Sequence, residues 1–107
     1  MCGRFAITTP SDAMARLFAA TPANDLPTVP NYNVCPTNSV HVVTGGEGRR
    51  LGAMRWGFIP HWYKSPTDGP LLINARAEGI GKESACAAAC RARRCLIPAD
   101  GLYEWTK

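Results

Sequence analysis

The first half of the chain alternates apolar strand-like segments with one amphipathic helix. Residues 3–8 mix aromatic and β-branched side chains in loose alternation, which predicts a strand. Residues 13–20 then place apolar side chains at helical spacing, and we expect Thr9 as the N-cap and Pro10 at the first helical position. Residues 21–37 hold four prolines and three asparagines, so we expect a loop there.

A hairpin and a loop-rich segment follow. Residues 39–44 form a β-branched run, and residues 49–58 return after a glycine-rich turn, which predicts two antiparallel strands. Residues 59–70 are rich in proline and aromatic side chains and predict a loop. Residues 71–74 are apolar and predict a short strand.

The last quarter of the chain predicts one more helix and a second hairpin. Residues 82–93 are rich in alanine and favour a helix. Residues 94–98 and 102–105 predict strands on either side of a turn at 99–101. The element order indicates an α+β fold with a mostly antiparallel sheet and two or more short helices. A predicted strand ends at Lys107 with nothing after it to pair with, so we expect a truncated domain or self-association through that strand.

Length and composition limit the size of the domain, the cellular compartment and the state of the cysteines. The 107 residues are enough for one small domain, 1–107, with a thin stability margin. The start of the chain lacks a secretory signal pattern, and we expect a cytoplasmic, nucleoid-associated protein. The five cysteines are an odd number, which favours reduced thiols over a disulfide framework. We expect no cofactor and no metal, with Cys86, Cys90 and Cys95 as core or helix-face residues.

The basic charge points weakly to nucleic acid. The net charge is +4, and nine of the twelve basic residues are arginine. Arginine is favoured where a planar fork binds phosphate, yet many small basic proteins bind no nucleic acid.

Cys2 has the most distinctive chemistry in the sequence. Removal of Met1 would place an α-amine and a thiol on one residue. The α-amine has a reference pKa of about 7.7–8.0, so part of it is an unprotonated nucleophile near neutral pH. Such an amine forms a Schiff base with an aldehyde, and the thiol can then close a thiazolidine ring. Judged alone, a cysteine at this position is more often a small buried hydrophobic residue.

Three other segments hold candidate site residues. Asn74, Arg76 and Glu78 alternate after the short strand and would share one face, either as a polar site or as a solvated sheet surface. Glu104 lies between two aromatic residues, where a carboxyl tends to have a raised pKa suited to acid–base work; the alternative is a surface glutamate. The aromatic segment 55–63 could stack on unpaired bases or form core.

Within that aromatic segment, different positions favour different surroundings. We expect Trp56 in the core, and Trp62 and Tyr63 at the surface. His41 alternates with Val40 and Val42 and is expected to point outward.

Several ordered blocks together resemble a known family. They are Met1–Phe5, Asn31–Val34 with Pro36–Thr37, Trp56–Trp62, Asn74–Glu78, and Arg94–Gly101 running into Tyr103–Trp105. In order and spacing these blocks resemble the SOS-response-associated peptidase (SRAP) domain, and they cover nearly the whole chain.

The resemblance implies roles for individual residues. Cys2 resembles the residue that crosslinks to abasic sites in single-stranded DNA, and Asn74 the residue that holds the amine and the sugar remnant. Glu104 resembles the carboxylate that assists Schiff-base chemistry and N-terminal self-processing. Arg4 and Arg76 resemble arginines that bind the flanking phosphates. The surface near which DNA is bent and unstacked would comprise Trp56, Phe58, Pro60 and Trp62.

The sequence departs from the family in two respects. The family's domains are longer, and their second half supplies further strands and a catalytic histidine for which neither His41 nor His61 stands in. A retained Met1 would block the α-amine, so this chain could be inactive as it stands.

Two alternatives to the crosslinking function stay open. One is a cysteine peptidase acting on peptides through the Cys2 thiol, although the sequence offers no base beside that thiol. The other is a non-enzymatic module for single-stranded nucleic acid, whose binding would be salt-sensitive and independent of Cys2.

Overall fold

The computed structural model describes residues 2–106 and divides them into two compact units. The first unit comprises residues 2–56 and 95–106, and the second comprises Gly57–Arg94. The elements of the first unit are β1 (Arg4–Ile7), α1 (Ser11–Leu17), β2 (Ala20–Pro22), β3 (Asn31–Val34), β4 (Ser39–Thr44), β5 (Arg49–Arg55), β6 (Cys95–Leu96) and β7 (Gly101–Tyr103). No helix in residues 2–106 is long and apolar enough to cross a membrane.

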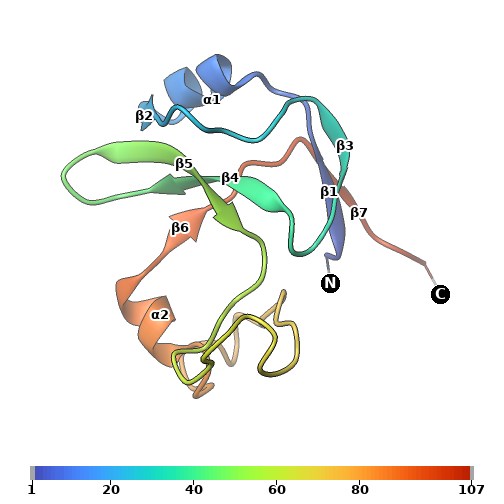
Figure 1. Ribbon diagram of the computed structural model, residues 1–107, viewed down its shortest axis with the longest axis vertical. Coiled ribbons are helices and arrows are strands. Elements are labelled where there is room, and N and C mark those ends of the chain that lie inside the picture. The colour runs from blue at the N-terminus through green and yellow to red at the C-terminus, as the bar shows by residue number, and fades with distance from the viewer. Residues whose placement is uncertain (1, 107) are drawn as a thin grey trace. The chain divides into compact units, whose positions relative to one another are not determined.

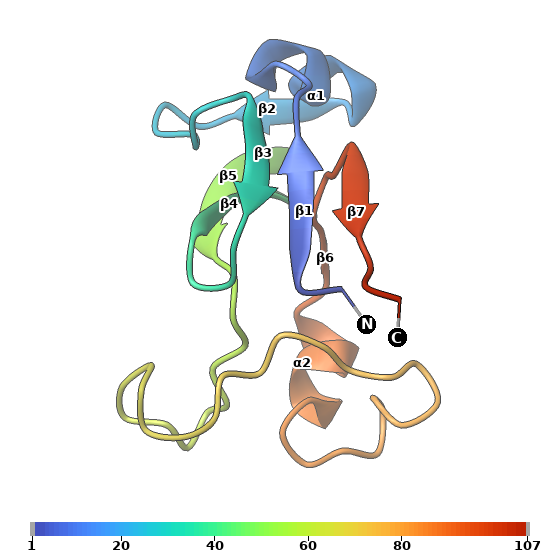
Figure 2. The ribbon, with the colours of Figure 1, turned by 90° about the vertical axis from the view of Figure 1, so that its right-hand side faces the viewer.

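Two open sheets organise the first unit. One has the order β3-β1-β7, with β1 antiparallel to both neighbours (Figure 2). The other has the order β2-β5-β4-β6, in which β4 and β5 form an antiparallel hairpin and β2 runs parallel to β5 (Figure 1). The predicted α+β class and mostly antiparallel pairing are confirmed, although the strands divide between two sheets.

The core of the first unit lies under β1, β4, β5 and α1. Strand β1 alternates, so that Phe5 and Ile7 are buried while Arg4 is exposed. Met14 of α1 and Leu51 of β5 are among the largest fully buried side chains in the described part of the chain. The remaining buried members of this cluster are Ala15, Val34, Val40, Val42 and Val43.

The start of α1 and the following loop differ from the prediction. Pro10 is the N-cap residue rather than the first helical residue, and the Thr9 hydroxyl bonds to Asp100 instead of capping the helix. The segment 21–37, predicted as loop, contains β3 and most of β2. These strands form because β1 and β5 offer them open edges, a long-range pairing that local composition does not encode.

The predicted second hairpin is wrong. Strand β6 pairs with β4 in one sheet, whereas β7 pairs with β1 in the other. The predicted turn at 99–101 therefore lies in a crossing between sheets. The outer edge of β7 has no partner strand within residues 2–106, and its three residues are exposed. The predicted self-association through this edge stays a prediction, and Lys107 lies outside the described residues.

The second unit is mostly loops and turns. Helix α2 (Ala87–Ala92) is shorter than the predicted helix 82–93, because turns occupy most of the residues before it. The predicted strand at 71–74 is reduced to a single bridge between Leu72 and Phe58. The loop is held instead by side chains, as when the Tyr63 hydroxyl donates to the Pro70 carbonyl at 3.0 Å.

His41 is buried, which corrects the prediction that it points outward. Only 2% of its surface is exposed, and its Nε2 lies 3.3 Å from the Ser11 hydroxyl of α1. The apolar run of β4 is covered on both faces, a pattern typical of an interior strand rather than of a half-buried one. Alternation with valines therefore did not indicate a solvent face.

We expect this histidine to make folding stability depend on pH. Burial lowers the pKa of His41 below the ordinary histidine value of 6.5, so the unfolded chain binds a proton more readily than the folded chain. Its contribution is therefore present above about pH 6.5 and declines as the pH falls below that value. Urea denaturation between pH 7.5 and 5.5 should show this decline, and His41→Phe should flatten it. The exposed His61 provides the control, because His61→Gln should leave the slope in place.

Candidate active site at the N-terminal edge of the sheet

The pairing of β1 with β7 brings the two ends of the described chain together. Arg4 lies opposite Tyr103, and Ala6 lies opposite Gly101, in antiparallel register. Cys2 precedes β1 and Glu104 follows β7 directly, so both lie at the same end of this sheet. Figure 2 shows the beginning of β1 beside the end of β7. Two predicted site residues from opposite ends of the sequence thus become neighbours in the fold.

Cys2 is half-buried and lies two residues before β1. Its Sγ donates to the carbonyl oxygen of Arg4 at 3.4 Å. This bond ties the Cys2 thiol to the first residue of the central strand β1. Met1 lies outside the described residues, and its removal stays a prediction.

Arg4 projects from the exposed face of β1 toward β3. Its Nη1 donates to the Asn33 side-chain oxygen at 3.0 Å. A guanidinium carries five N–H donors, so one bond orients it and leaves donors for an anionic ligand. The geometry is suited to binding a phosphate close to Cys2.

Tyr103 joins β7 to β3 across the central strand. Its hydroxyl donates to the Tyr32 carbonyl oxygen at 2.8 Å. Together with Arg4 and Asn33, it forms a polar row across all three strands. Sequence reasoning did not select Asn33 or Tyr103 as site residues, because their relation to Arg4 depends on strand pairing.

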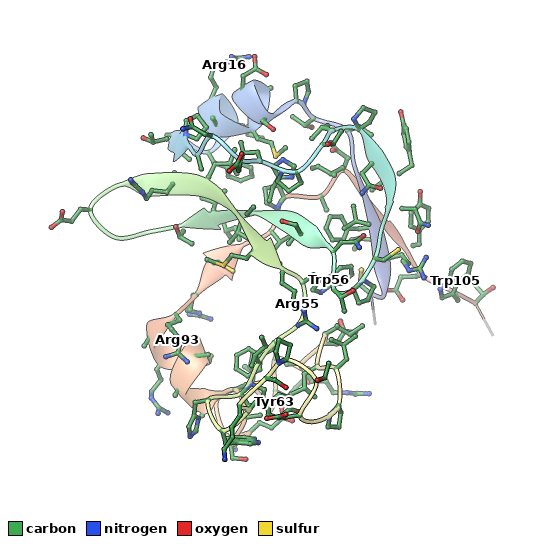
Figure 3. The ribbon with its side chains drawn as sticks, in the orientation of Figure 1. Arg16, Arg55, Trp56, Tyr63, Arg93 and Trp105 are labelled. Carbon is green, nitrogen blue, oxygen red and sulfur yellow. The ribbon has the colours of Figure 1, made fainter. Side chains whose placement is uncertain are left out.

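Glu104 is exposed, and so are its two aromatic neighbours. Trp105 projects into solvent beyond β7 (Figure 3). The enclosed apolar surroundings that the sequence predicted for this carboxylate are therefore not what the structure shows. Its accessibility still allows proton exchange with a bound substrate.

Trp56 packs against the core, as predicted. Its ring centroid lies 5.1 Å from that of Phe5, and the two ring planes are inclined by 54°. Its backbone nitrogen donates to the Asn38 carbonyl at 2.9 Å, which closes the end of the β4–β5 hairpin. Trp56 thus supports β1 from the core side.

The other predicted site residues belong to the second unit. They are Phe58, Pro60, Trp62, Asn74 and Arg76. Pro60 is buried, while Trp62 is 52% exposed and contacts His61 edge-on at a centroid distance of 5.1 Å. This places one large aromatic surface in solvent, as the sequence predicted.

The predicted row of Asn74, Arg76 and Glu78 is interrupted at Glu78. Asn74 and Arg76 are exposed and lie outside helices and strands, but Glu78 lies in a turn in which Gly79 and Ile80 donate to the Arg76 carbonyl. Glu78 therefore does not continue the alternation, and a shared face of Asn74 and Arg76 stays a prediction.

The cysteines of the described residues are free thiols. None of the five forms a disulfide within residues 2–106, and no group of three histidine, cysteine or acidic residues there could hold a metal ion. Burial, reinforced by Glu83 and Cys90, raises the pKa of Cys86 and so reduces its thiolate at neutral pH.

Comparison with known proteins decides the family. The family model for the SOS response associated peptidase (SRAP) matches residues 1–107. The chain belongs to the SRAP family. Among SRAP relatives, it is 39% identical over 111 residues to "Abasic site processing protein YoaM" of Bacillus subtilis, covering all of this chain and 48% of that protein. It is 33% identical over 112 residues to "Abasic site processing protein YedK" of Escherichia coli, covering 100% and 49%.

Two further comparisons involve a mammalian relative and a solved structure. The rat protein "Abasic site processing protein HMCES" is 32% identical over 130 residues, covering all of this chain and 37% of that protein. A crystal structure of a protein from Bordetella bronchiseptica has a TM-score of 0.75 at 24% identity, covering 96% of this chain and 50% of that one, and shows the shared fold. This SRAP chain thus spans about half the length of the first relatives it matches.

Proposed function

We propose that the chain, once Met1 is removed, captures abasic sites in single-stranded DNA through the Cys2 aminothiol. The observation that carries the proposal is the β1–β7 register, which sets Glu104 at the same sheet end as Cys2. The names of the curated relatives, all abasic site processing proteins, support the DNA lesion as the substrate.

The proposed chemistry has two steps. The α-amine of Cys2 adds to the C1′ aldehyde of the ring-opened deoxyribose, and loss of one water gives a Schiff base. The thiol then adds to the imine carbon, its proton passes to the nitrogen, and a thiazolidine forms. Glu104 exchanges protons in the first step: it accepts a proton from the amine and then gives one to the departing hydroxyl, which leaves as water. The same carboxylate would assist release of the residue before Cys2.

Other residues would bind the DNA. Arg4, oriented by Asn33, would bind a phosphate next to the lesion, and Arg76 a second phosphate. Asn74 would hold the amine and the sugar remnant. The exposed Trp62 suits stacking on an unpaired base. By the family resemblance, Phe58, Pro60 and Trp56 would also belong to the DNA-binding surface. We propose a role in the bacterial SOS response, at the nucleoid.

The test is intact mass spectrometry of a chain verified to begin at Cys2. The substrate is a single-stranded oligonucleotide whose one uracil has been removed by uracil glycosylase. We expect a heat-stable adduct with the summed mass of protein and oligonucleotide minus one water. A chain that keeps Met1, and an oligonucleotide with a tetrahydrofuran abasic analogue that lacks the aldehyde, should give none.

The same experiment separates the alternatives. An adduct formed equally by the Met1-retaining chain would contradict the aminothiol mechanism. Cleavage of a peptide in trans would favour a cysteine peptidase. Salt-sensitive binding of the tetrahydrofuran oligonucleotide without any adduct to the aldehyde would favour a non-enzymatic binding module.

A further inference from the structure

A single carboxylate ties the crossing between the two sheets to the far end of β1. Asp100 lies immediately before β7, and its Oδ2 accepts hydrogen bonds from the backbone nitrogens of Thr8 and Thr9 at 2.6 and 3.0 Å. Its Oδ1 accepts from the Thr9 hydroxyl at 2.8 Å. Its own backbone nitrogen donates to the Ala6 carbonyl, also at 2.8 Å.

These bonds can form in one register only. The β1–β7 ladder joins just three residue pairs, from Arg4↔Tyr103 to Ala6↔Gly101. A ladder this short specifies its register weakly, and a slip of one residue would turn every side chain to the opposite face. Moving β7 by one residue would withdraw the Asp100 carboxylate from both backbone donors.

The register of β7 also determines where Glu104 lies, at the other end of that strand. Glu104 follows Asp100 by one short strand, and Cys2 precedes the partner strand at that end. We propose that Asp100 is a positioning residue for the Cys2 reaction: by fixing the register of β7 on β1, it holds the Glu104 carboxylate beside the Cys2 aminothiol. This inference rests on the proposed function and adds a residue to it.

The Asp100 carboxylate, which we call the register clamp, is anionic at all pH values relevant to the reaction. The backbone bond from Thr8, followed by the hydroxyl and backbone bonds from Thr9, lowers the pKa of Asp100 to about 2. Its contribution to folding is therefore complete above the ordinary carboxyl pKa and is lost only as the pH falls from about 4 toward 2. A carboxamide in its place has one acceptor oxygen and presents donors where acceptors are needed.

The chain offers a matched control in its second unit. Asp68 accepts from the backbone nitrogens of Lys64 and Ser65, at 2.6 and 3.0 Å, and from the Ser65 hydroxyl at 2.8 Å. Asp68→Asn therefore makes the same change to an equivalent set of bonds, in a loop that does not pair with β1. Both variants are made in the chain that begins at Cys2.

The first measurement is the rate of crosslinking at saturating abasic oligonucleotide. We expect Asp100→Asn to reduce the rate about 10-fold, since misplacing a catalytic group by about 1 Å costs up to about 100-fold. Affinity for the tetrahydrofuran oligonucleotide should change less than about twofold, because the phosphate-binding residues stay in place. Asp68→Asn should leave both quantities unchanged.

A double-mutant cycle distinguishes positioning from general stability. In a Glu104→Gln background, which keeps the slow intrinsic reaction of the aminothiol, Asp100→Asn should have almost no further effect. An equal effect in both backgrounds would overturn the proposal, as would equal rates for the Asp100→Asn and Asp68→Asn chains.

Hydrogen–deuterium exchange of the backbone amides in β7 tests the register without any reaction with DNA. Exchange should accelerate in the Asp100→Asn chain and not in the Asp68→Asn chain. If the unsubstituted chain forms no adduct, the proposed function fails by itself, and unchanged exchange in β7 would then refute the register clamp separately.

Discussion

Cys2→Ser should eliminate the heat-stable adduct with abasic single-stranded DNA. The variant keeps an N-terminal amine and can still form a Schiff base, but its hydroxyl cannot supply the sulfur that closes a thiazolidine. We expect the yield after heating to fall at least about 100-fold, because removing the group that forms the lasting covalent bond costs orders of magnitude in rate. Denaturing gel electrophoresis of the heated reaction measures this yield.

Cys35→Ser provides a closely matched control. The Cys35 thiol is half-buried like that of Cys2 and donates to a carbonyl two residues away, that of Asn33, at 3.3 Å. It lacks a neighbouring α-amine, so its replacement should leave the yield within about twofold of the parent chain. Equal yields from the Cys2→Ser and parent chains would exclude the thiazolidine.

Leu51→Ala should lower the free energy of unfolding by about 2–5 kcal/mol. Leu51 is 0% exposed and lies in β5 with Val43 of β4 on one side and Pro22 of β2 on the other. Replacing a buried leucine by alanine costs about 2–5 kcal/mol, which is a large part of the roughly 5–15 kcal/mol that stabilises a typical domain. Urea denaturation followed by circular dichroism gives the change in the free energy of unfolding.

Met54, an exposed residue of the same strand β5, provides the control for Leu51. It is 53% exposed, so Met54→Ala should shift the free energy of unfolding by no more than about 0.5 kcal/mol. A Leu51→Ala chain as stable as the Met54→Ala chain would show that the hairpin is not the centre of this core.

Local patterns in the sequence predicted the elements that depend on neighbours in the chain. The β4–β5 hairpin follows from two apolar runs around glycines, and α1 follows from helical spacing of its apolar residues. Strands β3 and β7 depend instead on pairing with β1 from far along the chain, which propensity does not reveal. For the same reason, two strands predicted as one hairpin enter different sheets.

Some residues of the candidate site could likewise be predicted from the sequence, and others could not. The chemistry of Cys2 can be worked out from the residue itself, and the family resemblance pointed to Arg4 and Glu104. The sequence treats Asp100 only as a turn residue, because its partners Thr8 and Thr9 lie at the opposite end of the chain. Its role becomes visible only when the bonds between these distant segments are known.

The central place of β1 in its sheet has a consequence for the rate of the proposed reaction between Cys2 and abasic DNA. Chain termini usually fray, and a nucleophile on a frayed end must lose conformational entropy each time it meets its target. Here the strand that follows Cys2 is hydrogen-bonded on both sides, so that ordering takes place once, when the protein folds. A damaged sugar would then encounter an aminothiol of restricted motion, which raises its effective molarity toward the aldehyde.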